Sequence, residues 1–186
     1  MRKMTDCKTL FLDRDGVINV RKMDGYITKP EEFVFMDGVL EAFTMFSRMF
    51  ETIVVVTNQQ GIGKGLMSED DFEKVTRKMT DEINARSGRV DGIFHCPYLA
   101  RENHFTRKPS VGMGLQARKR FKNIRFKDSI MIGDSLSDVV FGKHLGMYTV
   151  HIAPDAEQAR MHPRLIDMRF DSLLEFAKYF QDEKKI

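Results

Sequence analysis

The chain has 186 residues, of which 42% are hydrophobic and 31% are charged. This length suits one domain with a sizeable core, and the composition is that of an ordinary globular protein, which excludes a disordered or fibrous one. The formal net charge is only +3 and the basic residues are spread along the chain, so we expect no nucleic-acid partner. We predict a single domain over residues 1–186 and favour a monomer.

Targeting features are weak. Residues 1–8 carry positive charge, but no apolar signal segment follows them. No apolar run approaches the roughly 20 residues that span a bilayer. The two cysteines, Cys7 and Cys96, do not make a disulfide framework. We therefore expect a cytoplasmic protein that does not bind a membrane.

The first third of the chain predicts a strand, a loop and a helix. The apolar run 9–12 is typical of a buried strand, and residues 13–17 (Asp-Arg-Asp-Gly-Val) follow it directly. Residues 19–29 show no periodicity, so we expect a loop over the mouth of a crevice. The apolar spacing over residues 39–50 predicts a helix that begins at Asp37 or Gly38.

The rest of the chain continues this alternation. The β-branched run 52–56 is typical of a strand buried on both faces. Ser68 and Asp71 form a capping box before a helix that we expect to end near Gly88. The remaining predicted elements are strands at 92–96, 129–132 and 148–152, and helices from Ser110 to Phe121, over 136–145 and over 172–180.

Strands that alternate with helices along the whole chain predict a doubly wound α/β fold. We expect a three-layer sandwich with a central, mostly parallel sheet. The connections are short, so no large cap domain is expected.

Polar motifs follow three of the predicted strands, and a fourth motif precedes a predicted helix. Residues two apart on an extended chain point to one side, so Asp13 and Asp15 are expected to face the crevice beyond the carboxyl ends of the strands. An Asp-Gly pair is also typical of a simple turn. The other motifs are Thr57-Asn58-Gln59-Gln60-Gly61, Arg107-Lys108-Pro109 and Gly133-Asp134-Ser135-Leu136-Ser137-Asp138.

Convergence of Asp13, Asp15, Asp134 and Asp138 would require a compensating charge. Two carboxylates about 4 Å apart repel by roughly 4 kcal/mol at an effective dielectric constant near 20. A hard divalent cation relieves this repulsion, and Mg²⁺ also binds substrate phosphate. In such a site Asp13 suits a nucleophile that forms an aspartyl-phosphate, and Asp15 suits a general acid and base.

Two further residues fit phosphoryl chemistry. The Thr57 hydroxyl can hold a phosphoryl oxygen, and Lys108 supplies positive charge where negative charge develops. Each acidic or basic residue also has a simpler interpretation: Lys108 as a solvated surface side chain, and Asp134 and Asp138 as helix-capping residues.

The four motifs, in this order, resemble those of the haloacid dehalogenase superfamily of phosphatases. The resemblance implies that Asp13 is the nucleophile, Asp15 the acid and base, Thr57 a phosphate contact and Lys108 a stabilising cation. It also implies Mg²⁺ bound by Asp13, the backbone carbonyl of Asp15 and Asp134. Asp138 is implied to support the metal or Lys108.

Longer segments narrow the resemblance to a compact branch of this superfamily, which contains heptose bisphosphate phosphatases and histidinol-phosphatases. The similar segments are Phe11–Val20, Gly25-Tyr26, Val55–Ile62 and Cys96-Pro97. The branch implies a small phosphorylated substrate, first of all a sugar bisphosphate and alternatively histidinol phosphate or another phosphomonoester. The implied substrate contacts are Arg21, Tyr26, Asn58, Gln59 and Arg107.

The chain departs from this branch at two places. The branch usually carries a zinc loop with several cysteines, whereas here Cys96-Pro97-Tyr98 is followed by no later cysteine, so we predict no zinc. The loop from Tyr98 to Thr106 is then expected to be shorter or looser. Ser135 stands where the heptose enzymes tend to carry a basic residue, which weakens the argument for a second substrate phosphate.

Two alternative functions, neither of them enzymatic, stay open at this point. A signalling receiver domain also places acids, a threonine and a lysine on a doubly wound sheet, but Asp15 and the chain length disfavour it. A catalytically silent binding module is disfavoured by the complete set of acids. Turnover of a phosphomonoester that disappears in Asp13→Asn would separate an enzyme from both.

Overall fold

The fold is built on one six-stranded parallel sheet. The structure, a computed structural model, describes residues 3–184. The strand order is β3-β2-β1-β4-β5-β6, and every pair of neighbouring strands is parallel. The strands are β1 (Thr9–Leu12), β2 (Thr52–Asn58), β3 (Gly92–Cys96), β4 (Ser129–Gly133), β5 (Tyr148–Ile152) and β6 (Met168–Phe170).

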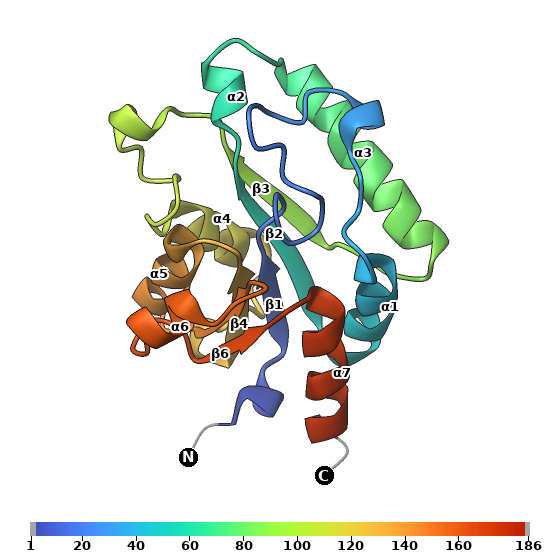
Figure 1. The fold of residues 1–186 in the computed structure, drawn as a ribbon, viewed down its shortest axis with the longest axis vertical. Helices are drawn as coiled ribbons and strands as arrows, with labels where there is room; N and C mark the ends of the chain where they lie inside the picture. The colour runs from blue at the N-terminus through green and yellow to red at the C-terminus, as the bar shows by residue number, and fades with distance from the viewer. Residues whose placement is uncertain (1–2, 185–186) are drawn as a thin grey trace.

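Helices cover both faces of this sheet (Figure 1). One face carries α1 (Val39–Met49), α3 (Glu69–Ala85) and α7 (Leu173–Lys184), and the other carries α4 (Gly112–Arg120) and α5 (Leu136–His144). Shorter helical segments lie in the connections: α2 (Gln60–Gly63), α6 (Glu157–Met161) and the 3-10 turns Met4–Asp6, Pro30–Glu32, Ala100–Glu102 and Phe126–Asp128. The predicted doubly wound, three-layer sandwich is confirmed.

The strands supply two separate apolar clusters because successive side chains point to opposite faces. In β1, Leu10 and Leu12 pack with α1 and α7, whereas Phe11 packs with α4 and α5. All three side chains are fully buried. A strand with three successive apolar residues is therefore buried on both faces.

Local sequence explains where two of the helices begin. Gly38 precedes α1 with φ of 75°, a left-handed conformation that glycine adopts without steric cost. Ser68 caps α3 by accepting a hydrogen bond from the Asp71 amide at 3.1 Å, and the Asp71 carboxylate accepts one from the Ser68 amide at 3.0 Å. Both starts agree with the sequence-based predictions.

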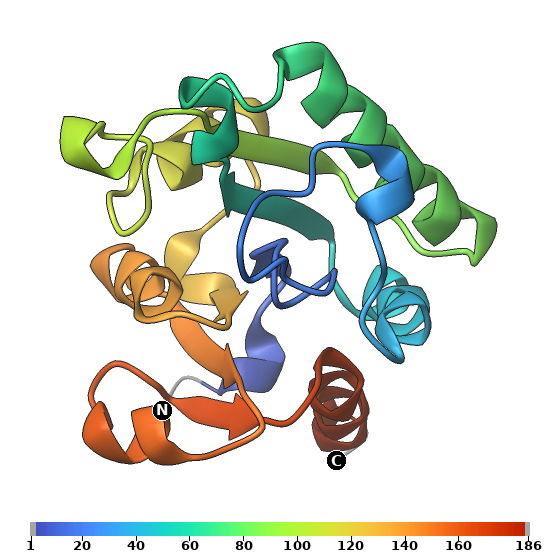
Figure 2. The ribbon, with the colours of Figure 1, turned by 45° about the horizontal axis from the view of Figure 1, so that its top comes forward.

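The connections position a crevice at the carboxyl ends of the central strands. The chain passes from β1 outward to β2 and β3, and then returns to β4 on the other side of β1. This reversal is the topological switch point at which doubly wound folds bind ligands. The segment after β1 lies over these strand ends, as Figure 2 shows, and its one helical element before α1 is the short turn Pro30–Glu32. No large cap interrupts residues 3–184.

Some elements differ from the prediction. The second strand continues to Asn58, α3 ends at Ala85, and α4 begins at Gly112. The short elements α6 and β6 were not expected, because five and three residues are too few for a periodic pattern. Within residues 3–184, no helix is both long and apolar enough to cross a bilayer.

Candidate active site

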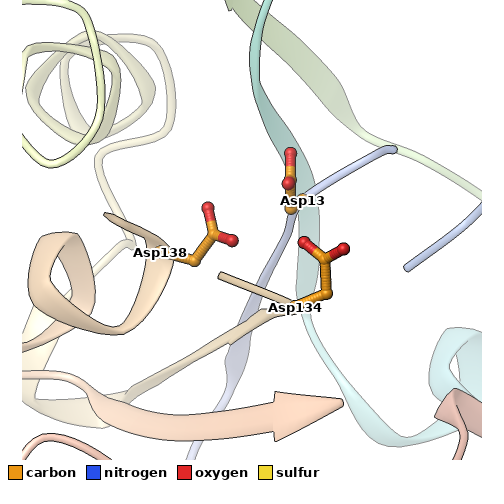
Figure 3. A group of neighbouring side chains, drawn as sticks. All are labelled: Asp13, Asp134 and Asp138. Atoms are coloured by element: carbon orange, nitrogen blue, oxygen red, sulfur yellow. The ribbon is translucent and has the colours of Figure 1, made fainter. Parts of the chain in front are cut away.

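Three carboxylates meet at the switch point, as Figure 3 shows. Asp13 follows β1, Asp134 follows β4, and Asp138 lies in the first turn of α5. One carboxylate oxygen from each lies within 4.8 Å of the other two. The motifs after the first and fourth predicted strands therefore converge, as the sequence indicated.

Lys108 enters this cluster from the loop before α4. Its ammonium group lies 2.8 Å from Asp13 Oδ1 and 2.6 Å from Asp138 Oδ1, and it donates to the Val56 carbonyl at 2.7 Å. The Lys108 side chain is only 1% exposed. The interpretation of Lys108 as a solvated surface residue is therefore wrong.

The electrostatics of the cluster show that its negative charge is not fully compensated. Burial, reinforced by the Asp138 carboxylate, raises the pKa of Asp13 to about 7, although Lys108 opposes this rise. Burial also raises the pKa of Asp134 to about 6. Burial alone would lower the pKa of Lys108, but the carboxylates of Asp13 and Asp138 raise it above its ordinary value.

A hard divalent cation fits this donor set. Three oxygen donors of carboxylates converge, and two of these groups carry raised pKa values that a cation would lower. Gly16 allows the close approach of one donor, since a Cβ atom at this position would lie 1.8 Å from Asp134 Oδ2. Gly16 also has φ of 92°, so both space and backbone require glycine.

The Asp15 carboxylate lies beside the cluster in a network of donors. Arg14 donates to both of its oxygens at 2.9 Å, and Asn19 and Gln59 donate at 3.0 and 2.8 Å. Burial opposes ionisation, but the Arg14 guanidinium and these hydrogen bonds hold the pKa of Asp15 below its ordinary value. Sequence reasoning missed Arg14, which is only 1% exposed.

Arg21 joins the loop over the crevice to the same acids. Its Nη2 donates to Asp134 Oδ1 at 2.8 Å and to the Asp15 carbonyl oxygen at 3.0 Å. These two oxygens are among the metal ligands that the sequence resemblance implies. A metal ion at that place and the Arg21 guanidinium would therefore compete for them.

The end of β2 supplies the opposite side of the site. Gln59 Nε2 donates to Thr57 Oγ1 at 2.8 Å, as well as to Asp15. The Asn58 side chain exchanges two hydrogen bonds with the backbone of Lys108, at 3.0 and 3.1 Å. Asn58 therefore fixes the loop that carries Lys108, a role that its sequence position did not indicate.

These groups open into a cavity of about 590 Å³. The cavity is lined by every residue predicted as a catalytic or substrate contact, including Tyr26 and Arg107. Basic residues that the prediction did not name, Lys22 and Lys64, also line it. Single exposed lysines have no spacing signal, so sequence reasoning could not single them out.

The segment that departs from the expected zinc loop is held by other contacts. Cys96 is buried in an apolar cluster at the end of β3. In the loop that follows, the rings of Tyr98 and His104 stack with centroids 3.7 Å apart, and a 3-10 turn spans Ala100–Glu102.

Residues 8–164 match the family described as polynucleotide kinase 3 phosphatase. The chain is 36% identical to D-glycero-alpha-D-manno-heptose-1,7-bisphosphate 7-phosphatase of Campylobacter jejuni, over 95% of this chain and 97% of that protein. It is also 36% identical to the beta-specific counterpart of Vibrio cholerae, with the same coverage.

Solved structures of heptose bisphosphate phosphatases are also similar to this chain. The D,D-heptose 1,7-bisphosphate phosphatase of B. bronchiseptica, in complex with magnesium and phosphate, superposes with a TM-score of 0.84. It is 25% identical and covers 95% of this chain and 99% of its own. The corresponding phosphatase of Burkholderia thailandensis has a TM-score of 0.68 at 30% identity, over 94% and 98% of the two chains.

Proposed function

The chain belongs to the haloacid dehalogenase phosphatases, in the family described as polynucleotide kinase 3 phosphatase, and from this premise we propose that it is a Mg²⁺-dependent sugar bisphosphate phosphatase. Its substrate is D-glycero-D-manno-heptose 1,7-bisphosphate, from which it removes the 7-phosphate. The observation that carries this proposal is the 36% identity to heptose bisphosphate phosphatases over 95% of the chain. We further propose a single-domain, monomeric enzyme of the cytoplasm.

In the first half of the reaction, a carboxylate oxygen of Asp13 attacks phosphorus. The bond between phosphorus and the ester oxygen breaks, and its electron pair goes to the departing sugar oxygen. Asp15 gives this oxygen a proton. A phosphate dianion beside Asp15 raises its proton affinity, which offsets the effect of Arg14 and lets Asp15 arrive protonated.

In the second half, Asp15 takes a proton from water, and the water oxygen attacks the phosphorus of the aspartyl-phosphate. The bond from phosphorus to Asp13 breaks, which releases inorganic phosphate and restores the Asp13 carboxylate and the protonated form of Asp15. The three donors to Asp15 support this step, because they stabilise the ionised form of the base.

Lys108 and the end of β2 orient and stabilise the phosphoryl group. Lys108 lies 2.8 Å from the oxygen of Asp13 and brings positive charge to the place where the phosphoryl group transfers. Asp138 holds Lys108 there. Thr57, next to Gln59, offers a hydroxyl to a phosphoryl oxygen.

Asp13, Asp134 and the Asp15 carbonyl would hold Mg²⁺, with Asp138 close by. When bound, the ion neutralises charge on the phosphoryl oxygens and on the converging carboxylates. The convergence of the donors and the raised pKa values of Asp13 and Asp134 support this assignment.

The remainder of the cavity suits a second phosphate. Arg21, Lys22, Lys64 and Arg107 line it on the side of the loops. These basic side chains offer a place for the phosphate that does not react, even though Ser135 carries no charge. This arrangement favours a bisphosphate over histidinol phosphate, whose second end is cationic.

The test is phosphate release in the presence of Mg²⁺ from both anomers of the heptose bisphosphate, from histidinol phosphate and from common sugar monophosphates. We expect kcat/KM to be highest for one heptose anomer. Equal, weak turnover of all compounds, or a preference for histidinol phosphate, would overturn the substrate assignment while leaving a phosphatase.

A further inference from the structure

The loop over residues 98–107 contains a pair of stacked rings. The Tyr98 and His104 rings lie 3.7 Å apart at an interplanar angle of 24°. His104 Nδ1 lies 2.7 Å from the hydroxyl of Thr106, which is buried. The rings themselves lie outside both apolar clusters of the core, and Tyr98 is 40% exposed. The stack therefore shapes the loop without forming part of the core.

Arg107 donates two hydrogen bonds, and both acceptors belong to the residues of this stack, while its own carbonyl accepts from the Ser110 amide at 2.8 Å. Its backbone amide donates to the His104 carbonyl at 2.9 Å, and its guanidinium Nη1 donates to the Tyr98 carbonyl at 3.2 Å. Arg107 is also a lining residue of the cavity and directly precedes Lys108. The stack thus fixes two carbonyl groups that together direct one cationic side chain.

The rest of the loop is anchored at both ends. The Pro97 carbonyl accepts from the Gly63 amide at 3.1 Å, and Lys108 is tied to Asn58 through its backbone. Between these anchors, the stack joins Tyr98 to His104, the Leu99 amide donates to the Glu102 carboxylate, and the Phe105 carbonyl accepts from the Gly112 amide at 2.9 Å. A long arginine side chain loses considerable conformational entropy when it binds a ligand, and a preset orientation reduces that loss.

We propose that Tyr98 and His104 are positioning residues, which hold Arg107 toward the cavity so that it binds the phosphate of the substrate that does not react. This proposal rests on the proposed function, because it assumes a substrate with a second anionic group. Tyr98 and His104 touch Arg107 and not the reacting atoms, so their loss weakens substrate binding and leaves the chemical step intact.

The test is a double-mutant cycle on KM and kcat with the preferred heptose bisphosphate. Arg107→Ala is expected to raise KM about 10- to 100-fold, the range of one charge-assisted hydrogen bond. Tyr98→Ala and His104→Ala are expected to raise KM about 2- to 10-fold, the range of one ring contact. In each variant kcat should stay close to that of the wild type.

Two controls separate positioning from a general effect on the loop. Tyr98→Phe keeps the ring, so its KM should equal that of the wild type. Arg101→Ala removes the same charge as Arg107→Ala from an exposed position in the same loop that does not line the cavity, and should leave KM unchanged. Melting temperatures of all variants identify any loss of folding.

The decisive variant is Tyr98→Ala combined with Arg107→Ala. If the stack acts through Arg107, the double variant has the KM of Arg107→Ala alone. Effects that multiply, or a Tyr98→Ala enzyme with unchanged KM, would overturn the proposal. Failure of the proposed function is distinguishable, because the wild-type enzyme would then prefer a substrate without a second phosphate. An Arg107→Ala enzyme with an unchanged KM for the heptose bisphosphate would overturn the positioning proposal itself.

Discussion

The strand ends and the loops around the cavity hold their charged groups in different ways. At the strand ends, the side chains of Lys108 and Asp138 are 1% and 0% exposed and lie 2.6 Å apart. On the loop side, the side chain of Arg21 is 47% exposed, although it also reaches an acid. Groups that the fold buries are preset for one reaction, whereas exposed cations can adapt to different substrates. The comparison assigns chemistry to the buried groups beside the strand ends and selectivity to the exposed groups of the loops.

The largest effect should come from the strand end of β1. Asp13→Asn is expected to lower kcat on the order of 10⁴-fold or more on every phosphomonoester, because it removes the proposed nucleophile. Phosphate release measures it. Burial and Asp138 already favour the uncharged form of Asp13, so the variant should melt no lower than the wild type without Mg²⁺. Substantial residual turnover would remove Asp13 from the chemistry.

Asp15→Asn should have the next largest effect. A general acid and base contributes about 10²- to 10⁴-fold, and kcat should fall within this range. The loss should be smaller for a substrate with a good leaving group, such as p-nitrophenyl phosphate, because that oxygen needs no proton. An equal loss on both kinds of substrate would argue that Asp15 only maintains the Arg14 and Gln59 network.

Arg21 lies where the two regions meet, so it tests the boundary between them. Arg21→Ala should bind Mg²⁺ several-fold more tightly in the absence of substrate, because the guanidinium no longer competes for Asp134 Oδ1 and the Asp15 carbonyl. Calorimetric titration with Mg²⁺ measures this change. Lys22→Ala, in the same loop, is the matched control and should bind Mg²⁺ like the wild type. Weaker binding by Arg21→Ala would show that Arg21 supports the metal site.

The pH dependence of Mg²⁺ binding should be the smallest effect. The pKa values of Asp13 and Asp134 are raised to about 7 and about 6, so both groups must lose protons before they bind a metal. Mg²⁺ affinity should therefore rise between about pH 5.5 and about pH 8.

The metal-free protein should behave in the opposite direction over this range. Because the folded-state pKa of each acid lies above its unfolded value, the stability that this contributes is present at low pH and is lost as pH rises through 6 and 7. Melting curves with and without Mg²⁺ at several pH values test both slopes. A stabilisation by Mg²⁺ that does not grow with pH would contradict the electrostatic account of the cluster.

Much of the site could be predicted because it depends on local patterns. The apolar runs at residues 9–12 and 129–132 fix where two strands end, and parallel strands bring Asp13 and Asp134 to one edge of the sheet. Gly38 and Ser68 likewise define helix starts from their own chemistry. These features require no knowledge of distant contacts.

Other features depend on contacts between distant segments. Arg21 and Asp134 are 113 residues apart, and no spacing rule predicts their contact. An arginine between two acids carries no sequence signal of burial, yet the fold buries Arg14 against Asp15 and the Phe72 ring. The strand β6 has a half-buried arginine at its centre and is defined by its pairing with β5.

The most direct test of the central claim is the detection of phosphate on Asp13. Asp15→Asn enzyme, in which hydrolysis of the intermediate is slow, would be mixed with Mg²⁺ and the heptose bisphosphate, quenched in acid and digested for mass spectrometry. We predict one added phosphoryl group on the peptide that contains Asp13, labile to hydroxylamine and absent when Asp13 is also replaced by Asn. Phosphate release with no covalent label, or a label on another residue, would contradict the mechanism.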